Sequence, residues 1–299
     1  MRRDAITQSG YGPAVVAATL DALIARMRGS APHLAGLSGL QGSGKSTFAI
    51  QLANAANARG IATQILSLDD FYLGRRARLQ LARAVHPLLA TRGVPGTHDI
   101  GLLMRSLDAL GAASPRHPAR LPRFDKGRDT RLAPSRWRRV DAAPALVILE
   151  GWCVGVPAQA AAALRTPLNA LERHEDRDAH WRRWVNAQLA GDYARLWARL
   201  DTLIVLQAPG FAVVSRWRDE QEHALRLRGA PHAMDAAALR RFLMHYERLS
   251  RHALATLPAR ADIRLLLGRN RNVRGIVDAA AAHVDQGVGR TGSTTTAVP

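Results

Sequence analysis

Short apolar runs alternate with amphipathic helical patterns along this chain. The runs typical of buried strands are residues 33–38, 61–70, 144–151, 201–209 and 261–268. Helical periodicity is found at residues 13–28, 46–59, 75–89, 178–200, 211–227 and 235–256. Strands that alternate with helices predict an α/β fold with a doubly wound parallel sheet of about five strands. Ligands bind such sheets at the carboxyl ends of the strands.

Between the second and third predicted strands the periodic pattern is lost. Residues 86–144 are rich in proline, glycine, histidine and arginine, and we expect them to be irregular. A connection this long in a compact domain is usually functional or disordered. We therefore predict a single domain over residues 1–285, in which residues 86–144 form a substrate-binding insertion. The small, polar residues 286–299 are expected to be a disordered tail.

A phosphate-binding loop follows the first predicted strand. Residues 39–46, GLQGSGKS, match G-x-x-x-x-G-K-[ST] between a strand and a helix. Glycines let successive backbone N–H groups face phosphate oxygens, and the helix N-terminus adds partial positive charge. Lys45 would reach the β- and γ-phosphates of ATP, and the Ser46 hydroxyl would hold Mg²⁺. The predicted nucleotide-binding residues are Gly39, Gly42, Ser43, Gly44, Lys45, Ser46 and Thr47.

Acidic residues end the second and third predicted strands. In SLDDFY, an acid could accept the proton of an acceptor hydroxyl. We predict Asp69 as this general base, with Asp70 as the alternative, although a carboxylate there could also cap a turn. Glu150 ends the third strand, where an acid beside such a loop binds Mg²⁺ directly or through water. A purely structural role is the alternative for Glu150.

A later helical segment carries several arginines. Arg216 and Arg218 lie within residues 211–230. Arginines on a movable helix can close over phosphates and neutralise charge during transfer, so we predict a lid here with both as catalytic residues. The alternative is a solvated helix face whose arginines pair with neighbouring acids.

The charge of the chain adds one candidate residue. The 299 residues include 42 Lys+Arg and 24 Asp+Glu, a net charge of +18, which could indicate a nucleic-acid partner. Only Lys45 and Lys126 are lysines, and the arginines are scattered through the helical segments, so we favour a compositional bias over nucleic-acid binding. The two lysines then mark places that need a compact ammonium, which makes Lys126 a candidate site residue.

The remaining composition bears on location. A lone cysteine, Cys153, excludes an internal disulfide and suits a reducing cytoplasm. The chain has no apolar run of membrane-spanning length, and its first residues lack a signal-peptide core. We expect a cytoplasmic protein that does not enter a membrane, and the sequence gives no indication of its oligomeric state.

Six segments together resemble one family. GLQGSGKST, SLDDFY, HPLLATRGVPGTHD, PRFDK, ILEGW and SRWRDEQE are similar, in order from about residue 33 to 270, to motifs of the D-glycerate 3-kinase family. These P-loop kinases are related to uridine kinase, phosphoribulokinase and pantothenate kinase. The resemblance implies Mg²⁺-dependent transfer of the γ-phosphate of ATP to a hydroxyl of D-glycerate or a similar hydroxy acid. It supports Asp69 as the base, Glu150 beside the metal and the arginine-bearing helix as a lid. The expected substrate-binding residues are Asp70, Tyr72, Arg92, His98, Asp99 and Lys126.

Two other functions are weighed against this one. The acceptor could be another alcohol, such as a nucleoside or pantothenate, or the chain could be a basic nucleotide-binding regulator that contacts nucleic acid. A nucleoside would need aromatic faces for its base, but between His86 and Arg139 the insertion offers only Phe124 and Trp137. A small carboxylate needs cationic donors instead, and the insertion supplies Arg92 and Lys126.

Overall fold

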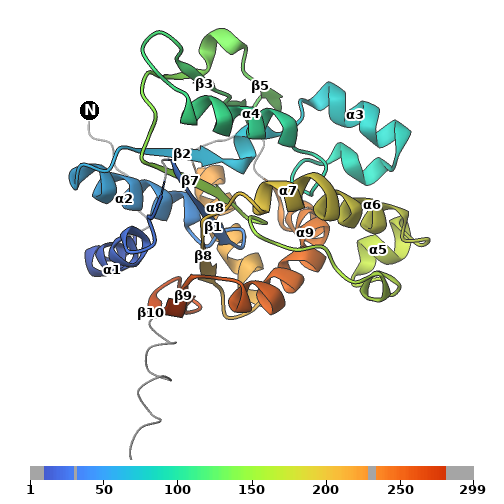
Figure 1. Cartoon of the computed structure of the whole chain (residues 1–299). Coiled ribbons are helices and arrows are strands. Elements are labelled where there is room, and N and C mark those ends of the chain that lie inside the picture. Colours follow the sequence, from blue (N-terminus) through green and yellow to red (C-terminus); the bar gives the residue numbers. More distant parts are fainter. Residues whose placement is uncertain (1–9, 30–31, 228–233, 281–299) are drawn as a thin grey trace, which may run out of the picture.

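A six-stranded sheet forms the centre of the structure, a computed structural model that describes residues 10–29, 32–227 and 234–280 (Figure 1). The strand order is β10-β9-β8-β1-β7-β2. The strands are β1 (His33–Gly39), β2 (Thr63–Ser67), β7 (Leu146–Gly151), β8 (Thr202–Gln207), β9 (Ile263–Leu267) and β10 (Val273–Asp278). Five strands are parallel and β10 pairs antiparallel with β9. The predicted doubly wound parallel sheet is confirmed, and β10, which the sequence did not predict, is an added edge strand.

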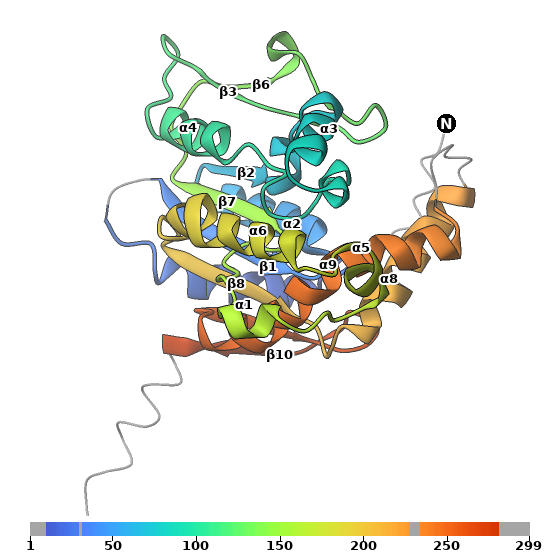
Figure 2. The same cartoon turned by 90° about the vertical axis from the view of Figure 1, so that its right-hand side faces the viewer.

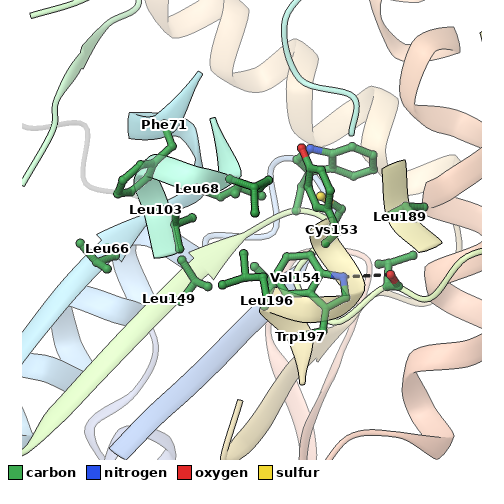
Figure 3. Packing of buried hydrophobic residues seen from close by; sticks show 14 of the residues in the cluster. Leu66, Leu68, Phe71, Leu103, Leu149, Cys153, Val154, Leu189, Leu196 and Trp197 are labelled. Atoms are coloured by element: carbon green, nitrogen blue, oxygen red, sulfur yellow. Dashed lines mark hydrogen bonds between the residues drawn. The ribbon is translucent and has the colours of Figure 1, made fainter. Parts of the chain in front are cut away.

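Strand alternation divides the core between the two faces of the sheet. On β7, Leu146 and Ile148 belong to one buried cluster, whereas Val147 and Leu149 belong to the other. The first cluster includes side chains of α1 (Pro13–Ile24), α2 (Lys45–Ala58) and α8 (Ala212–Leu227), and the second those of α4 (Ile100–Gly111) and α6 (His180–Gln188). The long helix α9 (Ala236–Thr256) contributes to both. Figure 3 shows part of the second cluster, where Leu66, Leu103 and Leu149 lie together.

Residues 86–144 are more ordered than the sequence indicated. They contain α4 and the short strands β3 (Ala119–Leu121), β4 (Phe124–Asp125), β5 (Thr130–Arg131) and β6 (Arg138–Val140). Strands β3 and β6 pair, as do β4 and β5, each antiparallel. The prediction of an irregular segment was wrong because the Asp99 side chain caps α4, accepting from the Leu102 N–H at 2.9 Å, and the helix buries an apolar face. Both views place this segment beyond the edge strand β2 (Figures 1 and 2).

Three predicted helices are shorter than expected, and the first of them, predicted over residues 13–28, is α1, which ends at Ile24. The helix predicted over residues 75–89 is α3 (Arg75–Ala84), followed by a 3₁₀ turn at Pro87–Ala90, because Pro87 has no N–H to continue it. The helix predicted over residues 178–200 is divided into α6 and α7 (Ala194–Trp197) by a turn in which Gly191 has non-helical backbone angles. A short helix, α5 (Ala170–Glu175), was not predicted. The tail 286–299 and the end of the predicted lid, 228–230, lie outside the described residues.

Candidate active site

The phosphate-binding loop joins β1 to α2 at the carboxyl edge of the sheet. Gly42 and Gly44 have φ angles of +79° and +88°, a left-handed conformation that glycine adopts without steric cost. A Cβ on Gly42 would also lie 2.6 Å from the Cβ of Trp217 on α8. The Ser43 hydroxyl and the Gln41 amide group are buried without a hydrogen-bond partner among the described residues. Buried polar groups normally have partners, and a bound phosphate would accept hydrogen bonds from the Ser43 hydroxyl and the Gln41 Nε2, so the loop fits a nucleotide.

Glu150 is brought to the start of α2 by strand register. Within β7 it follows Leu146 and Ile148 on the face that α2 covers, and it lies level with Ser67 of β2. Its Oε1 accepts hydrogen bonds from Ser46 Oγ at 3.1 Å and from Ser67 Oγ at 2.7 Å. The two residues predicted to hold Mg²⁺ are therefore in contact.

The chemistry of these donors fits Mg²⁺. Carboxylate and hydroxyl oxygens are the hard ligands that this ion prefers. No group of three or more His, Cys, Asp or Glu among the described residues could hold a metal by itself. That suits Mg²⁺ in kinases, where one or two protein oxygens and the substrate phosphates share the ion. The assignment of Ser46 and Glu150 as ligands stays a prediction.

Asp69 follows β2 in the 3₁₀ turn Leu68–Phe71. Its Oδ1 accepts from Tyr72 Oη at 2.7 Å, and its Oδ2 from Lys126 Nζ at 2.6 Å. Burial by itself would raise the pKa of the carboxyl, but the Lys126 ammonium, together with smaller contributions from Lys45 and Tyr72, outweighs burial, and the pKa falls from 3.8 to about 2. Asp69 is thus ionised at neutral pH.

Asp70 points in a different direction from Asp69. Its Oδ1 accepts the backbone N–H of Phe124 at 3.0 Å, which fastens β4 to the end of β2. Burial raises the pKa of this carboxyl above its ordinary value. The structure thus separates the two neighbours, since Asp69 lines the cleft described next and Asp70 anchors residues 86–144 to the sheet.

A cleft of about 310 Å³ opens beside the loop. Its charged lining residues are Lys45, Asp69, Arg92, Lys126 and Arg218. Four cations and one carboxylate therefore face this space, and both lysines of the chain are among them. An excess of positive charge in a recess attracts anionic ligands, here phosphates and an acidic acceptor.

Tyr72 lines the cleft, but the predicted substrate-binding residues His98 and Asp99, like Asp70, do not. The His98 ring lies behind Tyr72, stacked on it with 4.6 Å between ring centroids, and its Nδ1 is 2.6 Å from Tyr193 Oη. Burial lowers the pKa of His98 to about 4, so the ring is neutral at pH 7. The Asp99 carboxylate caps α4 and pairs with Arg131 at 3.2 Å. Both residues hold the fold of residues 86–144 together.

The two arginines predicted for the lid have different surroundings. Arg218 lines the cleft, with its guanidinium 5.7 Å from the Phe242 ring centroid and Nη2 2.6 Å from Glu222 Oε1. Arg216 donates to Asn270 Oδ1 at 2.9 Å, beyond the cleft lining. Of the two arginines, Arg218 alone lines the cleft in this structure.

A second hollow, of about 410 Å³, lies on the other side of the loop. Tyr11 and Arg271 line it; Tyr11 Oη donates to the Ser43 carbonyl at 2.6 Å and Arg271 Nε donates to the Gly42 carbonyl at 2.7 Å. Arg271 has a φ angle of +64°, which is uncommon for a residue with a side chain. Neither residue was predicted from the sequence, and no local pattern marks them, because the β9–β10 turn and the start of α1 meet the loop only in the folded chain.

Comparisons with known proteins show which proteins the chain is similar to. No protein-family model matches the chain. An uncharacterized kinase of Schizosaccharomyces pombe is 34% identical over 229 residues, covering 72% of this chain and 78% of that protein. The chloroplastic D-glycerate 3-kinase of Arabidopsis thaliana is 29% identical over 209 residues, covering 66% of this chain and 42% of that protein.

Solved structures show the same fold. D-glycerate 3-kinase from Cryptococcus neoformans aligns with a TM-score of 0.72 at 22% identity, over 89% of this chain and 100% of that one. A putative fructose transport system kinase from Silicibacter sp. TM1040 aligns with a TM-score of 0.52 at 24% identity, over 80% of this chain and 92% of that one. Within the described part of the chain, no helix has both the length and the apolar character to cross a membrane. The P-loop, the cationic cleft and these relatives together show that the chain belongs to the D-glycerate 3-kinase family of P-loop kinases and is a phosphotransferase.

Proposed function

We propose that this kinase transfers the γ-phosphate of ATP to a hydroxyl of D-glycerate or a similar hydroxy acid, with Asp69 as the general base. The observation that carries the proposal is the charge of the cleft, where four cations and a single carboxylate line the space beside the phosphate-binding loop. A small carboxylate is recognised best by cationic donors held in fixed positions. The D-glycerate 3-kinases among the relatives support this choice of acceptor.

The proposed reaction uses residues at both ends of the cleft. The loop N–H groups and Lys45 hold the phosphates, and Mg²⁺ held by Ser46 and Glu150 would offset their negative charge. The acceptor oxygen forms a bond to the γ-phosphorus while the bond from that phosphorus to the β–γ bridging oxygen breaks and ADP leaves. The hydroxyl proton passes to Asp69 and then to water.

The low pKa of Asp69 is compatible with this role. A carboxyl group with a pKa of about 2 is a weak base, but it is ionised at neutral pH and can accept a hydrogen bond from the acceptor hydroxyl. In a loose phosphoryl-transfer transition state the attacking oxygen keeps much of its proton until late, so orientation of the hydroxyl matters more than strong basicity. Asp69 therefore orients the acceptor first and receives the proton last.

The second hollow is proposed to hold the nucleoside of ATP. It adjoins Ser43, Gly44 and Thr47 of the loop and carries the neutral ring of Tyr11, whose pKa is raised by burial. Exchange of Arg271 for alanine should raise the KM for ATP several-fold and leave the acceptor KM unchanged. Steady-state kinetics with each substrate varied in turn test this, and an unaltered KM for ATP would place the nucleoside elsewhere.

Aromatic residues do line the cleft, although the insertion supplies few of them. Trp152 and Tyr246 are each 3% exposed and donate hydrogen bonds to the carbonyls of Gly93 at 2.9 Å and Arg92 at 2.8 Å. Phe242 is only partly buried, but the Arg218 guanidinium lies over its ring. These rings are used for packing rather than left open to stack on a base, which favours the hydroxy acid over a nucleoside.

An acceptor screen tests the proposal. Purified protein with γ-labelled ATP and Mg²⁺ is offered D-glycerate, L-glycerate, uridine and pantothenate at equal concentrations. We expect label to be transferred to D-glycerate, and an Asp69→Asn preparation run in parallel controls for contaminating kinases. Preferential labelling of uridine or pantothenate would overturn the choice of acceptor while leaving the phosphotransferase class intact.

A further inference from the structure

Asp129 lies between β4 and β5 and accepts hydrogen bonds from two guanidinium groups. Its Oδ1 is 2.5 Å from Arg92 Nη1, and its Oδ2 pairs with Arg78 Nη2. Arg78 belongs to α3, and Arg92 lies in the segment that leads to α4. Three segments far apart in the sequence are therefore joined through one carboxylate.

Arg78 fixes the position of this carboxylate. Its side chain is 2% exposed, and all three of its nitrogens donate hydrogen bonds. Nε donates to the Ala90 carbonyl at 3.2 Å and Nη1 to the Leu73 carbonyl at 2.6 Å, so the guanidinium is tied to the backbone at two points. A charge buried this far from water is tolerated only when paired, and Asp129 is its partner.

The backbone of Asp129 is held as well. Its φ angle is +54°, in the left-handed region that aspartate and asparagine enter more readily than most residues. The Asp129 carbonyl accepts the Arg75 N–H at 3.2 Å, where α3 begins. Both the main chain and the side chain of Asp129 are thus constrained from the same helix.

Arg92 has donors to spare. Its guanidinium uses Nη1 for Asp129 and lies 5.8 Å from the Phe124 ring centroid, and the residue lines the cleft. No described residue accepts a hydrogen bond from Nε or Nη2 of Arg92. A planar guanidinium with one nitrogen anchored and the others available is suited to two parallel hydrogen bonds with a carboxylate.

We propose that Asp129, fixed by Arg78, is a positioning residue that presents Arg92 to the carboxylate of the acceptor. Asp129 itself touches no substrate; it sets the angle at which the Arg92 guanidinium enters the cleft, and so makes the site selective for acidic alcohols. This inference rests on the function proposed above, and it gives the segment between β4 and β5 a part in specificity.

Exchange of Asp129 for asparagine tests the inference in the full-length protein. Asparagine keeps the size and the Oδ1 acceptor and tolerates the left-handed backbone, but it removes the charge that orients Arg92. We expect the KM for D-glycerate to rise about tenfold, as for loss of a charge-assisted hydrogen bond. The kcat and the KM for ATP should change less than about twofold.

A neighbouring carboxylate provides the matched control. Asp125 accepts the backbone N–H groups of Gly127 and Arg128 at 3.0 Å each, within the same turn, and has no contact with Arg92. Asp125→Asn should therefore leave the acceptor KM at the wild-type value. An equal rise in both variants would show that the turn as a whole is responsible and would overturn the inference.

Repeating Asp129→Asn in an Arg92→Met background separates the two proposals. Arg92→Met alone should raise the D-glycerate KM about 10- to 100-fold, and adding Asp129→Asn should raise it no further. Equal effects of Asp129→Asn in both backgrounds would mean that it does not act through Arg92. An unchanged D-glycerate KM in Arg92→Met would show that Arg92 does not bind the acceptor and would overturn this inference, whereas the acceptor screen described above tests the proposed function separately.

One more variant keeps the test valid if Asp129→Asn does not fold. Arg92→Lys preserves the charge but not the planar fork, so it should raise the acceptor KM several-fold with an unaltered KM for ATP. A wild-type acceptor KM in Arg92→Lys would overturn the inference, because a positioned guanidinium would then be unnecessary.

Discussion

Exchange of Lys126 for methionine tests how Asp69 acquires its low pKa. The Lys126 ammonium lies 2.6 Å from Asp69 Oδ2, and it is the main influence that opposes the effect of burial on this carboxyl. Methionine keeps the length of the side chain but removes the charge. With burial no longer opposed by the ammonium, the pKa of Asp69 should rise from about 2 to near or above its ordinary 3.8.

The stabilisation of the ionised Asp69 carboxylate follows from the same shift, which sums the effects of burial, Lys126, Lys45 and Tyr72. A decrease in pKa from 3.8 to about 2 would correspond to about 2 kcal/mol if no solvent screened these charges. The Lys126 side chain is 60% exposed, so we expect about 1 kcal/mol or less. Because the pKa of Asp69 is depressed in the folded state, this stabilisation is present above pH 3.8 and is lost as the pH falls toward 2. Lys126→Met should reduce this stabilisation.

The assay is a carboxyl titration by NMR on protein with labelled aspartate. The Asp69 signal is identified by its disappearance in Asp69→Asn, and acceptor kinetics at pH 7 accompany the titration. Lys126→Arg, which keeps a positive charge, should hold the pKa of Asp69 well below 3.8. Arg123→Met removes an exposed cation that acts on Asp70, and it should leave Asp69 unaffected. At pH 7 Lys126→Met should weaken the use of the hydroxy acid about tenfold and spare ATP binding.

One result would refute the reasoning about this pair. If the pKa of Asp69 stays near 2 in Lys126→Met, then the ammonium does not control the carboxylate, and Lys45 with the Tyr72 hydroxyl must account for its ionisation. A tenfold rise in the KM for ATP would instead assign Lys126 to the transferred phosphate.

Further substitutions test the remaining assignments at the cleft. Lys45→Arg should largely abolish phosphate transfer, because a guanidinium is too wide for the loop, and near-native turnover would remove the loop from the mechanism. Asp69→Asn should lower kcat roughly 10²–10⁴-fold while ATP binding, measured by calorimetry, persists. Asp70→Asn should be nearly as active as the wild type, because asparagine keeps an oxygen that accepts the Phe124 N–H of β4. If Asp70→Asn lost activity and Asp69→Asn kept it, Asp70 would be the general base instead. Arg218→Ala should reduce kcat more than ATP affinity, whereas Arg216→Ala should change neither by more than about twofold. Equal losses in the two variants would show that both arginines act at the cleft.

Local patterns in the sequence were sufficient for the central sheet and the phosphate-binding loop. The inner parallel strands β7 and β8 are mostly apolar because both faces of the sheet are covered, and that property can be read without knowing the partners. The loop motif specifies its own geometry, because the left-handed conformations of Gly42 and Gly44 depend on residues within the loop. Glu150 could be placed for the same reason, since the end of an apolar strand marks the carboxyl edge of the sheet.

Residues 86–144 show where such patterns fail. Their prolines and glycines suggested an irregular segment. In the structure β3 pairs with β6, and β4 and β5, which lie between them in the sequence, pair with each other. Strands of two or three residues carry too little alternation to be recognised. Their stability comes from contacts such as the Asp70–Phe124 hydrogen bond, which joins residues 54 positions apart.

The sequence by itself determined the fold class, the phosphate-binding loop and the acids at the carboxyl ends of β2 and β7, because each depends on residues close together in the chain. Only the tertiary structure decided which member of each neighbouring pair faces the cleft. Asp69 and Asp70 are adjacent, as Arg216 and Arg218 nearly are, and their directions are set by partners far away: Lys126 for Asp69, Phe124 for Asp70 and Asn270 for Arg216. A side chain's direction follows from the contacts that packing offers it, and those contacts form only when distant segments meet.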